Sequence, residues 1–178
     1  MKIWLAGLAM ASMAGAEWSQ PVEIVVDDAI CATYRARVDA SGMLLVRLTL
    51  ADGWHTFAMD NGVRAAEKLA GKKALGVDKP TSIAVTGGLT VDGPWMQPAL
   101  RDFSKPELRI FSWGFEKQAL FAAKVKRSGE PRAELRIQGQ ACTETICKNI
   151  DKTLELDLTG TAGNAEAEAT QLTPIRTQ

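Results

Sequence analysis

The chain has 178 residues, and its 21 Lys and Arg residues are balanced by 21 Asp and Glu residues. This length suits one domain with a substantial core, and the zero net charge excludes a global field that recruits nucleic acid. There are three cysteines. One disulfide with one cysteine left over is the simplest arrangement if the protein is in an oxidising compartment.

Residues 1–16 have the features of a cleavable export signal in the required order. Lys2 supplies a positive charge, an apolar run follows, and Ala14-Gly15-Ala16 forms a small-x-small cleavage site. The apolar run is shorter than the ~20 residues that a membrane-spanning helix needs, and no later stretch is long enough either. We therefore expect a signal peptide at 1–16, a mature periplasmic chain beginning at Glu17, and no membrane span in that chain.

The chain after Glu17 mostly shows the period-two alternation of β-strands, interrupted by Gly, Asp, Ser and Pro turn signals. The expected strands are 22–26, 33–38, 43–50, 55–59, 82–86, 108–113, 120–125, 134–137 and 153–158. Many short strands at this spacing predict an all-β fold, a sandwich of antiparallel sheets.

Two segments depart from the strand pattern. Residues 63–75 have apolar positions near helical spacing, which predicts one short helix. Residues 160–178 are mostly Ala, Glu, Thr and Gly with almost no large apolar side chain, which predicts a disordered tail. The folded domain is therefore expected to span residues 17–159.

The candidate site is the segment 140–148, Gln-Ala-Cys-Thr-Glu-Thr-Ile-Cys-Lys. Cys142 and Cys147 cannot face each other along one extended strand, but they can be bridged if the residues between them form a turn. Closing so short a loop stabilises the fold by only about 2 kcal/mol in the chain-entropy model, less than a long-range bridge would. An accessible, turn-borne bridge is suited to exchange. On the residues alone, an exchange-active disulfide and a structural one remain open.

Other chemistries have weaker signals. A zinc site would need two ligands besides the cysteine pair, and His55 is the only histidine, so no metal or other cofactor is predicted. A Ser-His-Asp hydrolase is rejected because no Gly-x-Ser-x-Gly elbow is present. His55 is interpreted as a structural residue at the end of the sandwich, and Cys31 as a small buried hydrophobic residue.

Three stretches resemble, in the right order, the periplasmic N-terminal domain family of the thiol:disulfide interchange protein DsbD. They are 52–57 (Asp-Gly-Trp-His-Thr-Phe), 113–116 (Trp-Gly-Phe-Glu) and 140–147. The resemblance covers roughly residues 34–158. It implies an immunoglobulin-like β-sandwich with the cysteine pair near one end.

The resemblance also implies a function. In that family the domain accepts electrons from a thioredoxin-like domain and passes them to periplasmic thiol proteins, and the second cysteine, here Cys147, forms the mixed disulfides. Lys148 beside it is expected to favour the thiolate. Phe111 and Trp113 match the aromatic cap loop that shields the pair.

The family's membrane domain and C-terminal thioredoxin-like domain are not in this sequence. The expected electron donor is therefore a separate thioredoxin-like protein or membrane electron carrier, and the predicted activity is thiol–disulfide interchange through Cys142 and Cys147. The alternative is a non-redox secreted β-sandwich binding protein in which the same pair is a structural disulfide.

Overall fold

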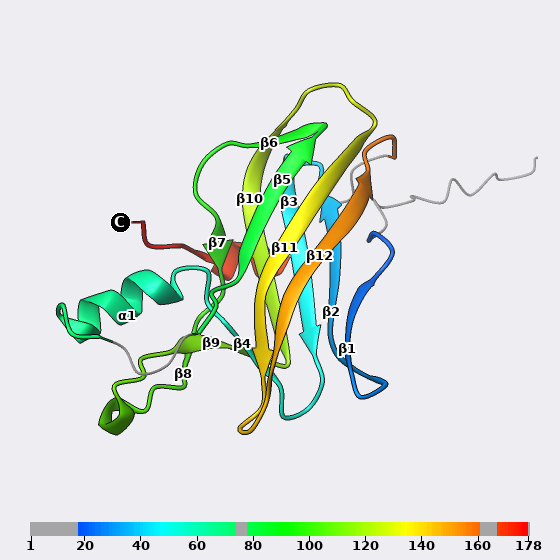
Figure 1. The fold of residues 1–178 in the computed structure, drawn as a ribbon. Helices are drawn as coiled ribbons and strands as arrows, with labels where there is room; N and C mark the ends of the chain where they lie inside the picture. Colours follow the sequence, from blue (N-terminus) through cyan, green and yellow to red (C-terminus); the bar gives the residue numbers. More distant parts are fainter. Residues whose placement is uncertain (1–17, 74–77, 161–166, 178) are drawn as a thin grey trace, which may run out of the picture.

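The computed structural model describes residues 18–73, 78–160 and 167–177. The predicted signal peptide and its cleavage site therefore lie outside the described residues. Within these ranges the strands form two antiparallel sheets that face each other (Figure 1). The first sheet contains, in spatial order, β1 (Val22–Val26), β2 (Ala29–Val38), β3 (Met43–Leu50), β10 (Gln118–Arg127), β7 (Met96–Gln97) and β13 (Thr173–Pro174), with β6 (Leu89–Val91) paired to β10.

The second sheet carries the cysteine pair. Its order is β12 (Cys147–Asp157), β11 (Arg132–Cys142), β4 (His55–Phe57), β9 (Trp113–Glu116) and β8 (Arg101–Asp102), with β5 (Ser82–Gly87) paired to β11. Strand β12 is thus an edge strand, and β5 and β4 share the other side of β11. The predicted strand 134–137 lies within the much longer β11, and the predicted strand 153–158 overlaps the end of β12 as far as Asp157. The register of β11 and β12 is continuous from Arg132↔Asp157 to Cys142↔Cys147.

The core lies between the two sheets and follows from the alternation of side chains along each strand. On β11 the residues Ala133, Leu135 and Ile137 are buried while their neighbours in sequence are exposed. They pack with residues of the first sheet such as Val46 and Phe121, which are fully buried. The predicted all-β sandwich is confirmed.

The helix and one loop differ from the sequence expectation. Helix α1 (Asn61–Leu69) begins two residues before the predicted segment and ends at Leu69, because Ala70 adopts a left-handed conformation at φ 47° and Gly71 follows. No strand forms over 108–112. There the chain makes a 3₁₀ turn, η1 (Pro106–Leu108), and β9 begins only at Trp113. Pro106 favours the start of such a turn, and Arg109 ends it at φ 52°.

The segment 167–177 also departs from the expectation of a disordered tail. It contains the 3₁₀ helix η2 (Ala167–Gln171) and strand β13, which pairs with β7. Leu172 packs on the outer face of the first sheet, where Leu45 and Leu120 are buried. The Ile175 N–H donates to the Trp95 carbonyl. These contacts therefore order a segment whose polar composition predicted disorder.

Among the described residues, no helix combines the length and apolar character needed to cross a membrane.

Candidate functional site

Cys142 and Cys147 form a disulfide that joins the last residue pair of the β11–β12 hairpin. Their sulfurs are bonded at 2.10 Å, and their Cα atoms are 4.0 Å apart. The hairpin turn is closed by Thr143, whose N–H donates to the Ile146 carbonyl at 2.8 Å and whose Oγ1 accepts from the Ile146 N–H at 3.1 Å. The local bridge and the hairpin predicted from the spacing are both confirmed.

The two sulfur-bearing residues differ sharply in accessibility. Cys147 is exposed on the edge strand, whereas Cys142 is 2% exposed and lies between Cys147 on one side and His55 of β4 on the other. Beside Cys147, the side chain of Ile146 is 46% exposed. Cys147 is therefore the more accessible residue of the pair, and it lies beside an exposed apolar side chain.

The disulfide lies on the outward face of the second sheet. Cys142 alternates with the buried Ala141, so it shares the outward face with Gln140 and not the core face. Lys148 is the cross-strand partner of Ala141 and therefore lies on the opposite face from Cys147. The expectation that Lys148 favours the Cys147 thiolate is not supported by this arrangement.

Burial raises the pKa of Cys31 above its usual value, and backbone hydrogen bonds and the Lys148 charge oppose this rise only in part. Cys31 is 2% exposed and unbonded, as expected of a small buried hydrophobic residue. With its pKa raised, this thiol is protonated and unreactive at neutral pH.

His55 is brought next to the disulfide by the order of the strands. It is the cross-strand partner of Cys142 on one side and of Glu116 on the other. Its ring stacks on Phe103 at a centroid distance of 4.6 Å and meets Phe57 edge-on at 5.5 Å. The sequence interpretation of His55 as a purely structural residue missed this neighbourhood, because the pairing of β4 with β11 joins segments more than 80 residues apart.

The electrostatic surroundings hold His55 in its neutral form. Burial lowers the pKa of His55 and is the largest effect; Glu116 and Asp78 oppose it, and Lys105 and Arg101 reinforce it. A neutral imidazole can exchange a proton with a neighbouring group at physiological pH.

Gly114 explains why β9 can approach β4 so closely. A Cβ at this position would lie 1.8 Å from the Thr56 carbonyl oxygen, so no side chain fits. Thr56 in turn ties β4 to β11, because its hydroxyl donates to the Gln140 carbonyl at 2.8 Å. The glycine of the Trp-Gly-Phe-Glu stretch therefore lets His55 lie between Glu116 and Cys142.

The cap residues predicted from the sequence, Phe111 and Trp113, lie just before β9 and at its start. Trp113 is the first residue of β9, three residues from Glu116 and thus about 10 Å along the strand from the level of His55. Its backbone N–H donates to the Asn61 side chain at 2.8 Å. Phe111 is partly buried in the preceding loop. Shielding of the disulfide by these two rings stays a prediction, while Phe103, which no sequence signal marked, covers His55.

No metal-binding geometry accompanies the cysteines. Across residues 18–73, 78–160 and 167–177, no group of three or more His, Cys, Asp or Glu side chains is placed to hold an ion.

The fold and the site define a class of protein: a β-sandwich with a half-exposed disulfide at the tip of an edge hairpin. No protein-family model matches the chain, and no curated protein matches it either. Among solved structures, the fold is similar to the N-terminal periplasmic domain of ScsB from Proteus mirabilis, with a TM-score of 0.54 and 22% identity over 83% of this chain. The chain spans about half, 53%, of that protein's length.

A second solved structure is the N-terminal domain of Neisseria meningitidis DsbD in the reduced form. Its TM-score is 0.44 with 13% identity, and the match covers 76% of this chain and 91% of that one. The resemblance that the three sequence stretches indicated is confirmed at the level of the fold by the similarity to the ScsB domain, and Cys142 and Cys147 lie at disulfide distance.

Proposed function

We propose that the chain is a periplasmic thiol–disulfide exchange module that passes electrons between a thioredoxin-like donor and periplasmic thiol proteins through Cys142 and Cys147. The observation that carries this proposal is the division of the pair into one exposed sulfur on an edge strand and one buried sulfur. A purely structural bridge has no need of such a division, whereas exchange requires one accessible sulfur to be attacked and a second to leave and return.

Reduction of the pair takes two steps. A thiolate of a dithiol partner attacks the Cys147 sulfur, forms a mixed disulfide and displaces Cys142 as a thiolate. The partner's second thiolate then attacks the partner's own sulfur in the mixed disulfide and releases Cys147. The partner is oxidised to a disulfide, and the pair gains two electrons and two protons. The reverse sequence, begun by the Cys147 thiolate, reduces a target.

His55 supplies a proton in this scheme. The displaced Cys142 thiolate is surrounded by protein, and burial disfavours the charged form of a thiol. His55 is its cross-strand neighbour, and its neutral imidazole carries one N–H proton and one acceptor nitrogen. When the neutral His55 passes its N–H proton to the Cys142 thiolate and takes up a proton from solvent at its other ring nitrogen, the products are a neutral thiol and a neutral imidazole, so no charge remains buried.

The placement in the periplasm has two supports. The first is the sequence of residues 1–16, which has the order of a signal peptide. The second is the fold shared with a domain of ScsB that is itself periplasmic. The proposed partners, a thioredoxin-like protein and a separate membrane electron carrier, follow from the resemblance of the three sequence stretches.

The reduction potential tests the proposal directly. The Cys31→Ala variant, which leaves only the pair to titrate, is equilibrated in glutathione buffers, and its free thiols are counted by mass spectrometry. We expect a midpoint well above about −300 mV, where exchange-active disulfides lie. A midpoint below that value would identify a structural bridge and favour the alternative, a non-redox binding protein.

A further inference from the structure

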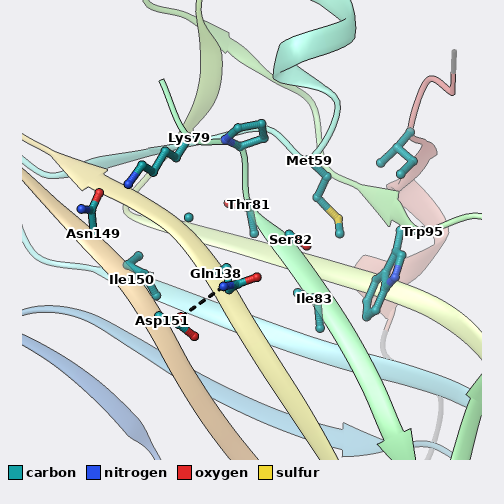
Figure 2. A pocket seen from close by; sticks show the side chains of 13 residues that line it. Met59, Lys79, Thr81, Ser82, Ile83, Trp95, Gln138, Asn149, Ile150 and Asp151 are labelled. Carbon is teal, nitrogen blue, oxygen red and sulfur yellow. Dashed lines mark hydrogen bonds between the residues drawn. The ribbon is translucent and has the colours of Figure 1, made fainter. Parts of the chain in front are cut away.

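A cavity of about 730 Å³ opens beside the disulfide on the second sheet. It is lined by the start of β5, the segment before it, and the middle of β11 and β12 (Figure 2). Asn149, one of its lining residues, is two positions from Cys147 on β12 and faces the same side of the sheet. The cavity therefore begins at a residue about 7 Å along β12 from Cys147.

The two sides of the cavity differ chemically. Figure 2 shows Lys79 and Asn149 on one side and Met59 and Trp95 on the other. Ile175, from the ordered C-terminal segment, also lines the cavity. Trp95 is 9% exposed, so its ring forms part of a firm apolar wall. A ligand that fits must be polar at one end and apolar at the other.

The charge at the polar end is positive. Asp151 also lines the cavity, but its carboxylate is held by the Arg136 guanidinium at 2.9 and 2.8 Å and by the Gln138 amide at 3.1 Å. These hydrogen bonds lower the pKa of Asp151 to about 2 and compensate its charge. Lys79 is exposed, and its ammonium forms no ion pair within the described ranges. An anionic group complements this end.

We propose that this cavity is a subsite for the residues that flank the cysteine of a peptide or protein thiol, selecting an acidic residue two positions from the cysteine and an apolar residue beyond it. The inference rests on the proposed exchange function. An extended chain advances about 3.3–3.6 Å per residue, so a residue two positions from the attacking cysteine lies level with Asn149 and within reach of Lys79. The following residues then extend toward Trp95 and Met59.

Binding is tested without exchange. The peptide acetyl-Ser-Ala-Glu-Ala-Leu-amide, which has no thiol, is titrated into the oxidised protein while the indole N–H resonances are followed by NMR, with Trp95→Phe to assign the signal of Trp95. We expect the Trp95 signal to shift and that of Trp18, on the other sheet, to stay in place. No Trp95 shift at millimolar peptide, or an equal shift of Trp18, overturns the subsite.

Selectivity is tested by the rate of disulfide reduction. The thiol peptides acetyl-Cys-Ala-Glu-Ala-Leu-amide and its Glu-to-Lys and Leu-to-Ser forms are compared on the wild type, on Lys79→Glu, and on Lys124→Glu. Lys124 is exposed on β10 of the other sheet and provides the same charge change away from the cavity. We expect the wild type to prefer the Glu peptide about two- to fivefold, as an exposed ion pair allows, and Lys79→Glu to reverse that preference.

The outcomes separate the subsite from the exchange function. Reduction by dithiothreitol, which has no flanking residues, is expected to be equal in all three proteins. If all peptides react alike while dithiothreitol reduces the pair, the subsite is refuted and the exchange function stands. If Lys124→Glu matches Lys79→Glu, the effect is one of overall charge and the subsite is refuted. If no thiol reduces the folded protein, the exchange function fails, and the NMR titration alone decides whether the cavity binds the peptide.

Discussion

Replacement of Phe103 by alanine is expected to open the disulfide to small thiols at little cost in stability. The Phe103 ring is partly buried and stacks on His55, the neighbour of Cys142, at 4.6 Å. Full burial of a phenylalanine side chain contributes about 1.5–3 kcal/mol, and an aromatic pair adds about 0.5–1.5 kcal/mol. Because the ring is only partly buried, we expect Phe103→Ala to lower the free energy of unfolding by about 1–2 kcal/mol.

Two comparison variants define what this result means. Phe121 is fully buried in the core, so Phe121→Ala is expected to cost about 3–5 kcal/mol. Trp113→Ala tests the cap role predicted from the sequence. If Trp113 shields the disulfide, its loss speeds reduction as well. If only Phe103 does so, the Trp113 variant reacts at the rate of the wild type.

The assay is the rate of reduction by glutathione, measured with the urea midpoint of each variant. We expect Phe103→Ala to be reduced several-fold faster than the wild type while it remains folded. Phe121→Ala is the control for faster reduction through unfolding, and its rate is expected to rise only in proportion to its unfolded fraction. A stable Phe103→Ala variant with unchanged reduction kinetics would refute the reasoning that this loop ring covers the site.

Four further predictions follow from the site and the sequence. Cys142→Ser is expected to accumulate a mixed disulfide with a thioredoxin-like partner on non-reducing gels, whereas Cys147→Ser, which lacks the accessible sulfur, is expected to trap far less; equal trapping would contradict the assigned order. Because burial lowers the pKa of His55, the folded protein binds a proton at His55 less readily than the unfolded chain does. The urea midpoint is therefore expected to fall as pH drops below about 6.5, and His55→Gln is expected to abolish this part of the pH dependence. Gly114→Ala is expected to cost at least about 1–3 kcal/mol, measured by urea unfolding, because its methyl group collides with a backbone carbonyl on β4; a neutral effect would show that the close approach is not required. Intact-mass measurement of protein from the periplasm is expected to show a chain that begins at Glu17, and a mass that retains 1–16 would contradict export.

His55 and the buried carboxylate of Asp60 begin to affect stability at different pH values. The contribution of His55 to the free energy of unfolding changes with pH between two values: its lowered pKa in the folded protein and its ordinary pKa of about 6.5 in the unfolded chain. The pKa of Asp60 is lowered despite burial, because it accepts hydrogen bonds from Arg64, Gln97 and the Arg176 backbone. Its contribution is present above the ordinary carboxyl pKa of about 3.8 and is lost only as pH falls below that value. A loss of stability near pH 6 is therefore assigned to His55 and not to the carboxylates.

The local features of this protein follow from its sequence alone. Alternation of apolar residues predicted Met43–Leu50 with the bounds that the structure has, because a strand with a buried face repeats every two residues. The spacing of Cys142 and Cys147 between two strand signals predicted the hairpin and its bridge, since both depend on contacts between residues close in the chain.

The tertiary structure decided what surrounds the bridge. His55 reaches Cys142 only through the pairing of β4 with β11, and Phe103 reaches His55 from a loop whose sequence carries no periodic signal. Lys148, adjacent to Cys147 in sequence, faces the other side of the sheet because side chains alternate along a strand. The segment 167–177 is ordered by long-range contacts that its polar composition does not predict. One of them is the hydrogen bond that the Arg176 N–H donates to the buried Asp60 carboxylate. The register and order of the strands decide which residues distant in sequence become neighbours of the disulfide. Register and order depend on the packing of the whole sandwich and not on any local pattern.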